Sequence, residues 1–116
     1  MQKPSDDIYG LHLKLKNRQV SAIELAKDAI NSAERSQNNA FISVTADLAL
    51  AQAEAQDKLI QKDGPTTTLQ GIPYTLKDLF ATKGVRTTAG SRILYNYVPP
   101  YDGYVSASLT RSGGVL

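Results

Sequence analysis

The sequence predicts an α/β fold in which amphipathic helices precede the first strands of a sheet. Apolar residues recur at helical spacing through residues 1–64. An apolar run follows at Leu69–Phe80, then a helical segment over Gly103–Arg111, and then the apolar pair Val115–Leu116. A strand, a crossover helix and a second strand pair in parallel, and this unit is typical of an α/β core.

The first predicted helix spans Asp6–Asn17. Its apolar residues Ile8, Leu11 and Leu15 share one face. His12 lies beside this face, and we interpret it as a surface or boundary residue because no partner cluster for catalysis accompanies it.

The second predicted helix begins at a capping box formed by Ser21 and Glu24 and runs from Ala22 to about Arg35. Its expected apolar stripe consists of Ile23, Ala26, Ile30 and Ala33. The stretch Phe41–Thr45 that follows this helix is predicted to form a short strand.

The third predicted helix covers about Ala46–Gln61 and is rich in good helix formers. We expect its packing face to consist of Leu48, Ala51, Ala55 and Leu59. A Gly-Pro and threonine loop follows, so the chain divides into a helical region, 1–64, and the start of an α/β core, 69–116.

One lysine, Lys77, lies inside the apolar run Leu69–Phe80, which is predicted to be a buried strand. Removing an ammonium group from water is costly unless the group is paired or loses its proton. A buried lysine that has lost its proton can act as a base, so Lys77 is the candidate catalytic residue. Alternatively, its side chain reaches the surface or pairs with Asp78 or Asp102.

Beyond this run the sequence predicts a polar loop over Thr82–Ser91 and a possible helical turn at Arg92–Tyr95. Asp102 follows two prolines and is a candidate N-cap for the helix at Gly103–Arg111. The tyrosines near these prolines are expected to cover the edge of the sheet; they are Tyr95, Tyr97, Tyr101 and Tyr104.

The composition excludes several classes of function. The chain has no cysteine and one histidine, which excludes disulfides and thiolate metal sites and argues against zinc. The net charge of +2 is too small to indicate nucleic-acid binding by itself. The chain shows no apolar run of membrane-spanning length and no secretory signal, so we expect a cytoplasmic protein without membrane contact.

Several blocks of the chain carry a resemblance to a known family. They are Ser21–Glu24, Asn39–Ile42, Gly71–Pro73, Lys77–Asp78, Thr82–Leu94 and Pro99–Asp102. These blocks resemble the start of the amidase signature family, and within it the glutamyl-tRNA(Gln)/aspartyl-tRNA(Asn) amidotransferases. The resemblance implies a single amidase domain with a mixed sheet, of which residues 1–116 are an N-terminal fragment holding the first strands and one helix.

The resemblance also implies a Ser–cis-Ser–Lys mechanism. Lys77 would be the neutral base that draws a proton through a bridging serine, and the second serine would attack the amide carbonyl. Both serines are expected beyond Leu116, because the chain has no Gly-Gly-Ser-Ser stretch. Since a triad acts as a unit, we expect residues 1–116 alone to hydrolyse nothing.

The implied partners follow from the same resemblance. Ammonia released from glutamine would pass to a second subunit, which uses ATP and Mg²⁺ to amidate mischarged Glu-tRNA or Asp-tRNA. The chain itself would hold no cofactor and no metal, and would assemble with the B and C subunits of the amidotransferase. Two alternatives stay open: a family member that hydrolyses a small amide without tRNA, and a short protein that only binds.

Overall fold

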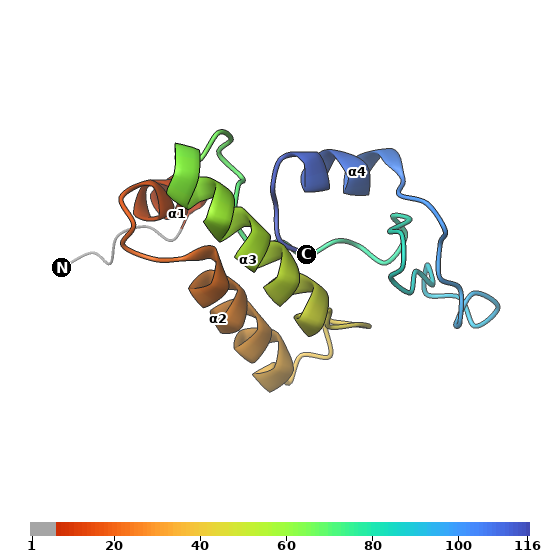
Figure 1. Cartoon of the computed structure of the whole chain (residues 1–116). Helices are drawn as coiled ribbons and strands as arrows, with labels where there is room; N and C mark the ends of the chain where they lie inside the picture. Colours follow the sequence, from red (N-terminus) through yellow and green to blue (C-terminus); the bar gives the residue numbers. More distant parts are fainter. Residues whose placement is uncertain (1–6) are drawn as a thin grey trace.

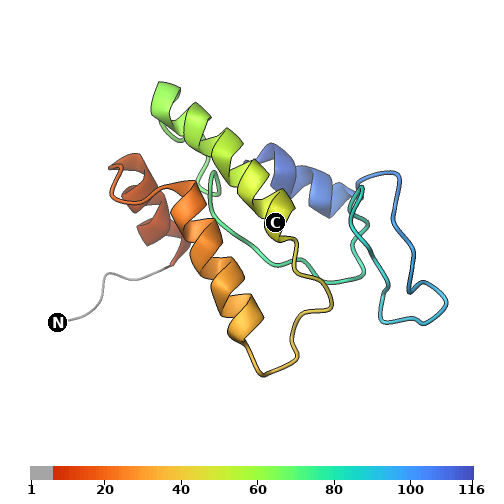
Figure 2. The same ribbon diagram turned by 60° about the horizontal axis from the view of Figure 1, so that its bottom comes forward.

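The computed structural model describes residues 7–116, and this part of the chain forms four helices. They are α1 (Ile8–Lys16), α2 (Ala22–Arg35), α3 (Ala46–Asp63) and α4 (Tyr104–Arg111). In Figures 1 and 2, α1, α2 and α3 form one group, and α4 lies on the other side of α3 together with an irregular segment. The four predicted helices are therefore confirmed, apart from Asp6, which lies outside the described residues.

The start of α2 is fixed by two sets of side chains. Ser21 Oγ accepts from the Glu24 amide at 3.1 Å, and the Glu24 carboxylate accepts from the Ser21 amide at 2.8 Å, which confirms the capping box. The carboxylate of Asp57, from α3, accepts from the amides of Ala22 at 2.7 Å and Ile23 at 3.1 Å. A helix start leaves these N–H groups without partners of its own, so Asp57 both satisfies them and ties α3 to α2.

The packing face of α3 differs from the predicted one. The buried residues of α3 are Ala49, Ala53, Asp57 and Ile60, whereas Leu48 and Leu59 of the predicted face are 36% and 51% exposed. The buried face of α3 has regular helical spacing but includes the Asp57 carboxylate. A prediction from apolar spacing places a carboxylate on the solvent side, so it selected a different face. Because the Asp57 carboxylate binds the start of α2, the side of α3 that carries Asp57 faces the core and the predicted leucine side is more exposed.

The hydrophobic core lies where α1, α2 and α3 meet the C-terminal residues. Its buried members are Leu15, Ala22, Ala26, Ala49, Ala53, Ile60, Ile72 and Val115. Half of them are alanines, and the four alanines lie on α2 and α3, which pack against each other. Small side chains let the two helices approach closely but bury little apolar area, so this core is small.

Of the run Leu69–Phe80, only Pro73 forms a β-bridge, which is parallel and joins it to Val115. Three main-chain hydrogen bonds surround this bridge: Gly71 N to Gly113 O at 2.9 Å, Val115 N to Ile72 O at 3.0 Å, and Tyr74 N to Val115 O at 2.8 Å. The direction is the one expected for a strand–helix–strand unit. A single bridge defines no sheet, so the predicted mixed sheet stays a prediction.

Two local predictions were wrong. Phe41–Thr45 forms no strand, because no neighbouring segment pairs with its main chain as a ladder. Asp102 does not cap α4; the N-cap is Gly103, which has no side chain to bind the helix start. The Asp102 carboxylate instead accepts from the amide of Lys83 at 2.8 Å and so holds two loops together. In the part of the chain that the structure describes, no helix is long and apolar enough to cross a membrane.

Candidate functional site

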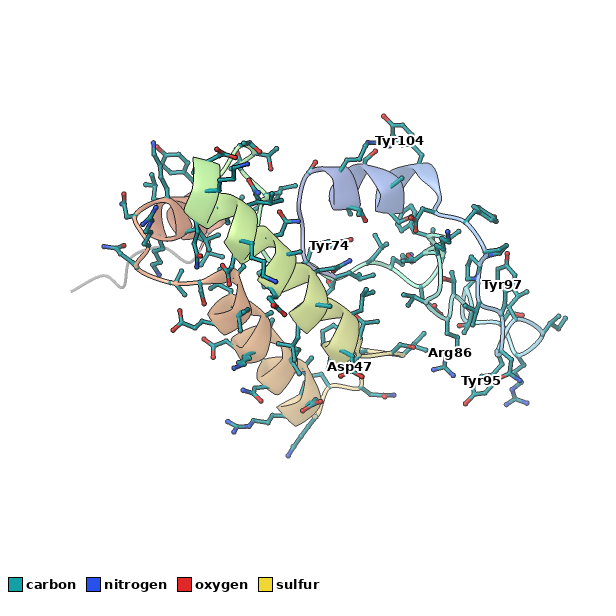
Figure 3. The ribbon with its side chains drawn as sticks, viewed as in Figure 1. Asp47, Tyr74, Arg86, Tyr95, Tyr97 and Tyr104 are labelled. Carbon is teal, nitrogen blue, oxygen red and sulfur yellow. The ribbon has the colours of Figure 1, made fainter. Side chains whose placement is uncertain are left out.

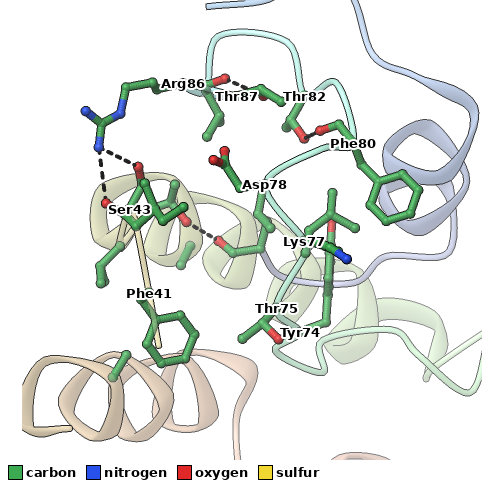
Figure 4. A pocket seen from close by; sticks show the side chains of 18 of the residues that line it. Phe41, Ser43, Tyr74, Thr75, Lys77, Asp78, Phe80, Thr82, Arg86 and Thr87 are labelled. Atoms are coloured by element: carbon green, nitrogen blue, oxygen red, sulfur yellow. Dashed lines mark hydrogen bonds between the residues drawn. The ribbon is translucent and has the colours of Figure 1, made fainter. Parts of the chain in front are cut away.

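A groove with a volume of about 770 Å³ separates α2 from the segment that follows Pro73. Its walls are formed by α2, by residues 40–45, by residues 73–80 and by the loop at 85–90, and Val115 and Leu116 complete the lining. Most of the lining is apolar, and its only charged members are Lys77, Asp78 and Arg86 (Figure 4). A largely apolar concavity with a few polar groups is the usual form of a small-molecule site.

Lys77 lies in this groove but is exposed, so the predicted burial of this lysine was wrong. The run that carries it is bound through its main chain to residues 113–115 on one side, and its other side faces the open groove. Among residues 7–116, the Lys77 ammonium has neither a hydrogen bond nor an ion pair, so the predicted alternative of a pair with Asp78 or Asp102 is not formed.

Asp78 holds the loop on the far side of the groove. Its carboxylate accepts from the Thr88 amide at 2.9 Å and from the Thr88 hydroxyl, and its carbonyl accepts from the Ala89 amide at 2.6 Å. Partial burial works to raise the pKa of Asp78, but the hydrogen bonds from Thr88 and Gly90 and the charge of Arg86 outweigh it, so the pKa lies below its usual value. Asp78 therefore holds the loop at residues 88–90 in place.

Arg86 lines the groove and was not singled out in the sequence. Its guanidinium donates to the Ile42 carbonyl at 3.1 Å and to Ser43 Oγ at 3.3 Å. The same group lies over the ring of Tyr95, 4.8 Å from its centre (Figure 3). These contacts join residues 41–45 to the loops that follow Phe80. Because the partners lie far apart in the chain, local sequence patterns do not predict these contacts.

The three charged side chains of the groove therefore differ in whether other protein groups bind them. Asp78 and Arg86 are both held by protein groups, whereas the Lys77 head group has no partner among the described residues. Residues 7–116 bring together no group of three or more His, Cys, Asp and Glu side chains that could hold a metal ion. His12 lies outside the groove and stacks on Tyr9, with 6.5 Å between ring centres.

Curated relatives resemble the chain over nearly its whole length. The A subunit of the glutamyl-tRNA(Gln) amidotransferase of Geobacter sulfurreducens is 47% identical over 111 residues, which cover 94% of this chain and 23% of that protein. Its counterpart in Anaplasma marginale (strain Florida) is 49% identical over 109 residues, again 94% of this chain, and 22% of that protein. The chain thus spans about a quarter of the length of these relatives.

Solved structures and a family model agree with these relatives. A structure described as "Crystal structure of amidase" matches with a TM-score of 0.81 at 26% identity, over 95% of this chain and 25% of that one. A second, from work on a vestigial protein complex and the evolutionary origins of an s-triazine catabolic enzyme, matches with a TM-score of 0.84 at 28% identity, over 91% of this chain and 24% of that one. The family model described as Amidase covers residues 22–116. The chain therefore belongs to the amidase family.

Proposed function

We propose that the chain is the N-terminal part of an amidotransferase A subunit that hydrolyses glutamine. The ammonia would serve the amidation of mischarged Glu-tRNA(Gln) or Asp-tRNA(Asn) by the B and C subunits, which would use ATP and Mg²⁺. The relatives that carry the name of this subunit are 47% and 49% identical to the chain, against 26% and 28% for the solved structures. This difference supports the tRNA amidotransferases over other amidases.

The catalytic base in this proposal is Lys77. The observation that carries it is that, within residues 7–116, Lys77 alone among the charged groups of the groove has no protein partner, whereas Asp78 and Arg86 are held in place. A lysine becomes a general base when it loses contact with water. The proposed mechanism therefore requires further polypeptide, carrying the bridging and nucleophilic serines, to cover the groove over Lys77.

The test is a chimera in which this chain replaces the matching segment of the Geobacter sulfurreducens A subunit. We expect the chimera to release ammonia from glutamine, and Lys77→Ala to lower kcat by at least about a thousandfold, as loss of a triad member does. The matched control is Lys83→Ala, since Lys83 is also exposed but lies outside the groove. Full activity of the Lys77→Ala chimera would remove Lys77 from the catalytic machinery.

Residues 1–116 alone should release no ammonia from glutamine, because the serines of the proposed triad are absent from them. Turnover above background that disappears in Lys77→Ala would contradict this expectation. An alternative is a family member that hydrolyses a small amide without tRNA. A chimera that cleaves simple amides faster than glutamine, and that does not co-purify with B and C subunits, would favour this alternative.

A further inference from the structure

Lys77 lies at one end of a span of main chain that has few anchors of its own. At the other end of this span the Tyr74 amide donates to the Val115 carbonyl at 2.8 Å, next to the parallel bridge. Within residues 7–116, neither Thr75 nor Leu76 takes part in a main-chain hydrogen bond. The position of Lys77 therefore depends on what holds the chain directly after it.

The chain directly after Lys77 is held at Asp78 by three hydrogen bonds to one turn. The Asp78 carboxylate accepts from the Thr88 amide at 2.9 Å and from the Thr88 hydroxyl, and the Asp78 carbonyl accepts from the Ala89 amide at 2.6 Å. The contact from the Phe80 amide to the Lys77 carbonyl, at 3.1 Å, joins near neighbours in the chain and does not attach them to another segment. The bonds of Asp78 are thus the second anchor of the span that carries Lys77.

The turn that Asp78 binds is strained. It is closed by the Ser91 amide, which donates to the Thr88 carbonyl at 2.9 Å, and Ala89 within it has a φ of 50°. This left-handed conformation costs a residue with a Cβ atom about 1 kcal/mol. Strain of this kind persists where the surrounding structure imposes it, and it is concentrated at functional sites. Here the contacts of Asp78, one of them with the Ala89 amide itself, hold the turn in its strained form.

The Asp78–Thr88 contact reaches from the groove into the protein behind it. Asp78 lines the groove together with Lys77, whereas Thr88 is 4% exposed and does not line it. In Figure 4 the side chains of Lys77 and Asp78 point apart, and the Asp78 carboxylate is directed toward the segment that carries Thr87. The Thr88 hydroxyl therefore touches no ligand of the groove, and it acts on the groove through Asp78.

We propose that Asp78 and Thr88 are positioning residues for Lys77, the base of the proposed function on which this inference rests. Their contact fixes the main chain beside Lys77 and so confines its head group to one region of the groove. A general base must lie within hydrogen-bonding distance of the group whose proton it takes, and a misplacement of about 1 Å can lower the rate about a hundredfold. The lysine stem is flexible, and among the described residues no partner holds the Lys77 head group, so the main chain must supply this precision.

The test uses the chimera with the Geobacter sulfurreducens A subunit and compares Thr88→Val with Thr88→Ser. Valine has nearly the shape of threonine but no hydroxyl, whereas serine keeps the hydroxyl that binds Asp78. We expect Thr88→Val to lower kcat for glutamine by at least about tenfold, with KM within about twofold of its original value, and Thr88→Ser to recover most of this loss.

The matched control is Asp102→Ala. The Asp102 carboxylate also joins two loops, through the Lys83 amide at 2.8 Å, but Asp102 does not line the groove. Its loss should therefore loosen the chain without displacing Lys77, and we expect kcat to stay within about twofold.

The pH profile separates positioning from a general loss of structure. Both Thr88 variants leave the charged members of the groove, Lys77, Asp78 and Arg86, unchanged. We expect Thr88→Val to move the midpoint of the acid limb of kcat/KM to higher pH by at least about 0.5 unit, because a less confined base meets more water and keeps its proton longer. A smaller amount of folded enzyme would instead lower the whole profile without moving its midpoint.

The outcomes distinguish this inference from the proposed function. If the chimera hydrolyses glutamine and depends on Lys77, but Thr88→Val keeps its kcat and pH profile, the contact does not position the base and the proposed function is unaffected. Equal losses in Thr88→Val and Asp102→Ala, with no shift of the midpoint, would assign Thr88 a purely structural role. If the chimera is inactive, or if Lys77→Ala keeps full activity, the proposed function fails and this inference fails with it. Should Thr88→Val not fold, Asp78→Asn is measured in its place, and an unchanged kcat would overturn the inference.

Discussion

At the scale of single residues, the state of each charged side chain of the groove depends on the segments that pack around it. Lys77 was singled out by the apolar residues around it, and it does lie in the groove, but it is exposed. Burial depends on what packs against both faces of a segment, and an apolar run alone does not show whether its second face is covered. The contacts of Arg86 were not predicted for a related reason, because its partners Ile42, Ser43 and Tyr95 lie in two different segments.

The lowered pKa of Asp78 predicts a specific pH dependence of stability. Because the pKa in the folded chain lies below the ordinary value of 3.8, this carboxylate adds stability above that value and loses it as the pH falls through the folded pKa. Asp78→Asn should therefore cost about 1 kcal/mol of unfolding free energy at neutral pH, and the cost should vanish in strong acid. Urea unfolding across this range tests it.

Thr88→Val separates the parts of the Asp78 contact. It removes the hydroxyl, which donates to the carboxylate and accepts from the Gly90 amide at 3.1 Å, and keeps both the carboxylate and the Thr88 amide that binds it. We expect the part of its cost that comes from Asp78 to disappear in acid, and the part that comes from the Gly90 amide to remain there. A cost of Asp78→Asn that is equal at neutral and acid pH would show that the lowered pKa does not stabilise the loop.

At the scale of elements, helices were predictable and their packing was not. Helical spacing located the four helices of residues 7–116, the capping box located the start of α2, and α2 has the predicted bounds. The face of α3 was predicted incorrectly because Asp57, a buried carboxylate, binds the start of α2. The strand predicted at Phe41–Thr45 does not form, because β-propensity alone does not supply a neighbouring strand to pair with. Such features depend on contacts between distant segments, which local patterns do not contain.

The contact between Asp57 and the start of α2 should dominate the stability of the helical group. Asp57→Ala leaves the Ala22 and Ile23 amides without acceptors, one of them in a buried bond, and we expect a loss of about 3 kcal/mol. Ser21→Ala removes the acceptor of the capping box only and should cost about 1 kcal/mol. The control is Asp28→Ala on the exposed side of α2, with a change within about 0.5 kcal/mol. Equal losses for Asp57→Ala and Asp28→Ala in urea unfolding would contradict this order.

At the scale of the whole molecule, the described part of the chain is less compact than a finished domain of its length. Its radius of gyration is 14.9 Å, and a compact domain of this length has one of about 13 Å. The groove, the small alanine-rich core and the single parallel bridge also indicate loose packing. Of the segments predicted to form one sheet, residues 7–116 show only the parallel bridge between Pro73 and Val115, because pairing depends on contacts between distant segments that the sequence pattern does not contain.

The helical group packs closely against the C-terminal half at Gly71, and this predicts a large effect of a single methyl group. A Cβ atom there would lie 3.1 Å from Ala22 Cβ, 3.3 Å from Ile60 Cδ1 and 3.5 Å from Leu15 Cδ1, so it would meet α2, α3 and α1 at once. The φ angle of Gly71 is also positive, at 77°. Gly71→Ala should therefore combine about 1 kcal/mol of backbone strain with about 1–3 kcal/mol of crowding in the core.

Gly84→Ala is the matched control, because Gly84 has a φ of 75° but no atom within 4 Å of an added Cβ. It should show the backbone strain alone, and the difference between the two variants in urea unfolding measures the crowding. We expect Gly71→Ala to be the less stable by at least about 1 kcal/mol. Equal losses would mean that the three helices yield to a methyl group at little cost. Close contact at Gly71 would then not determine how α1, α2 and α3 pack against the C-terminal half.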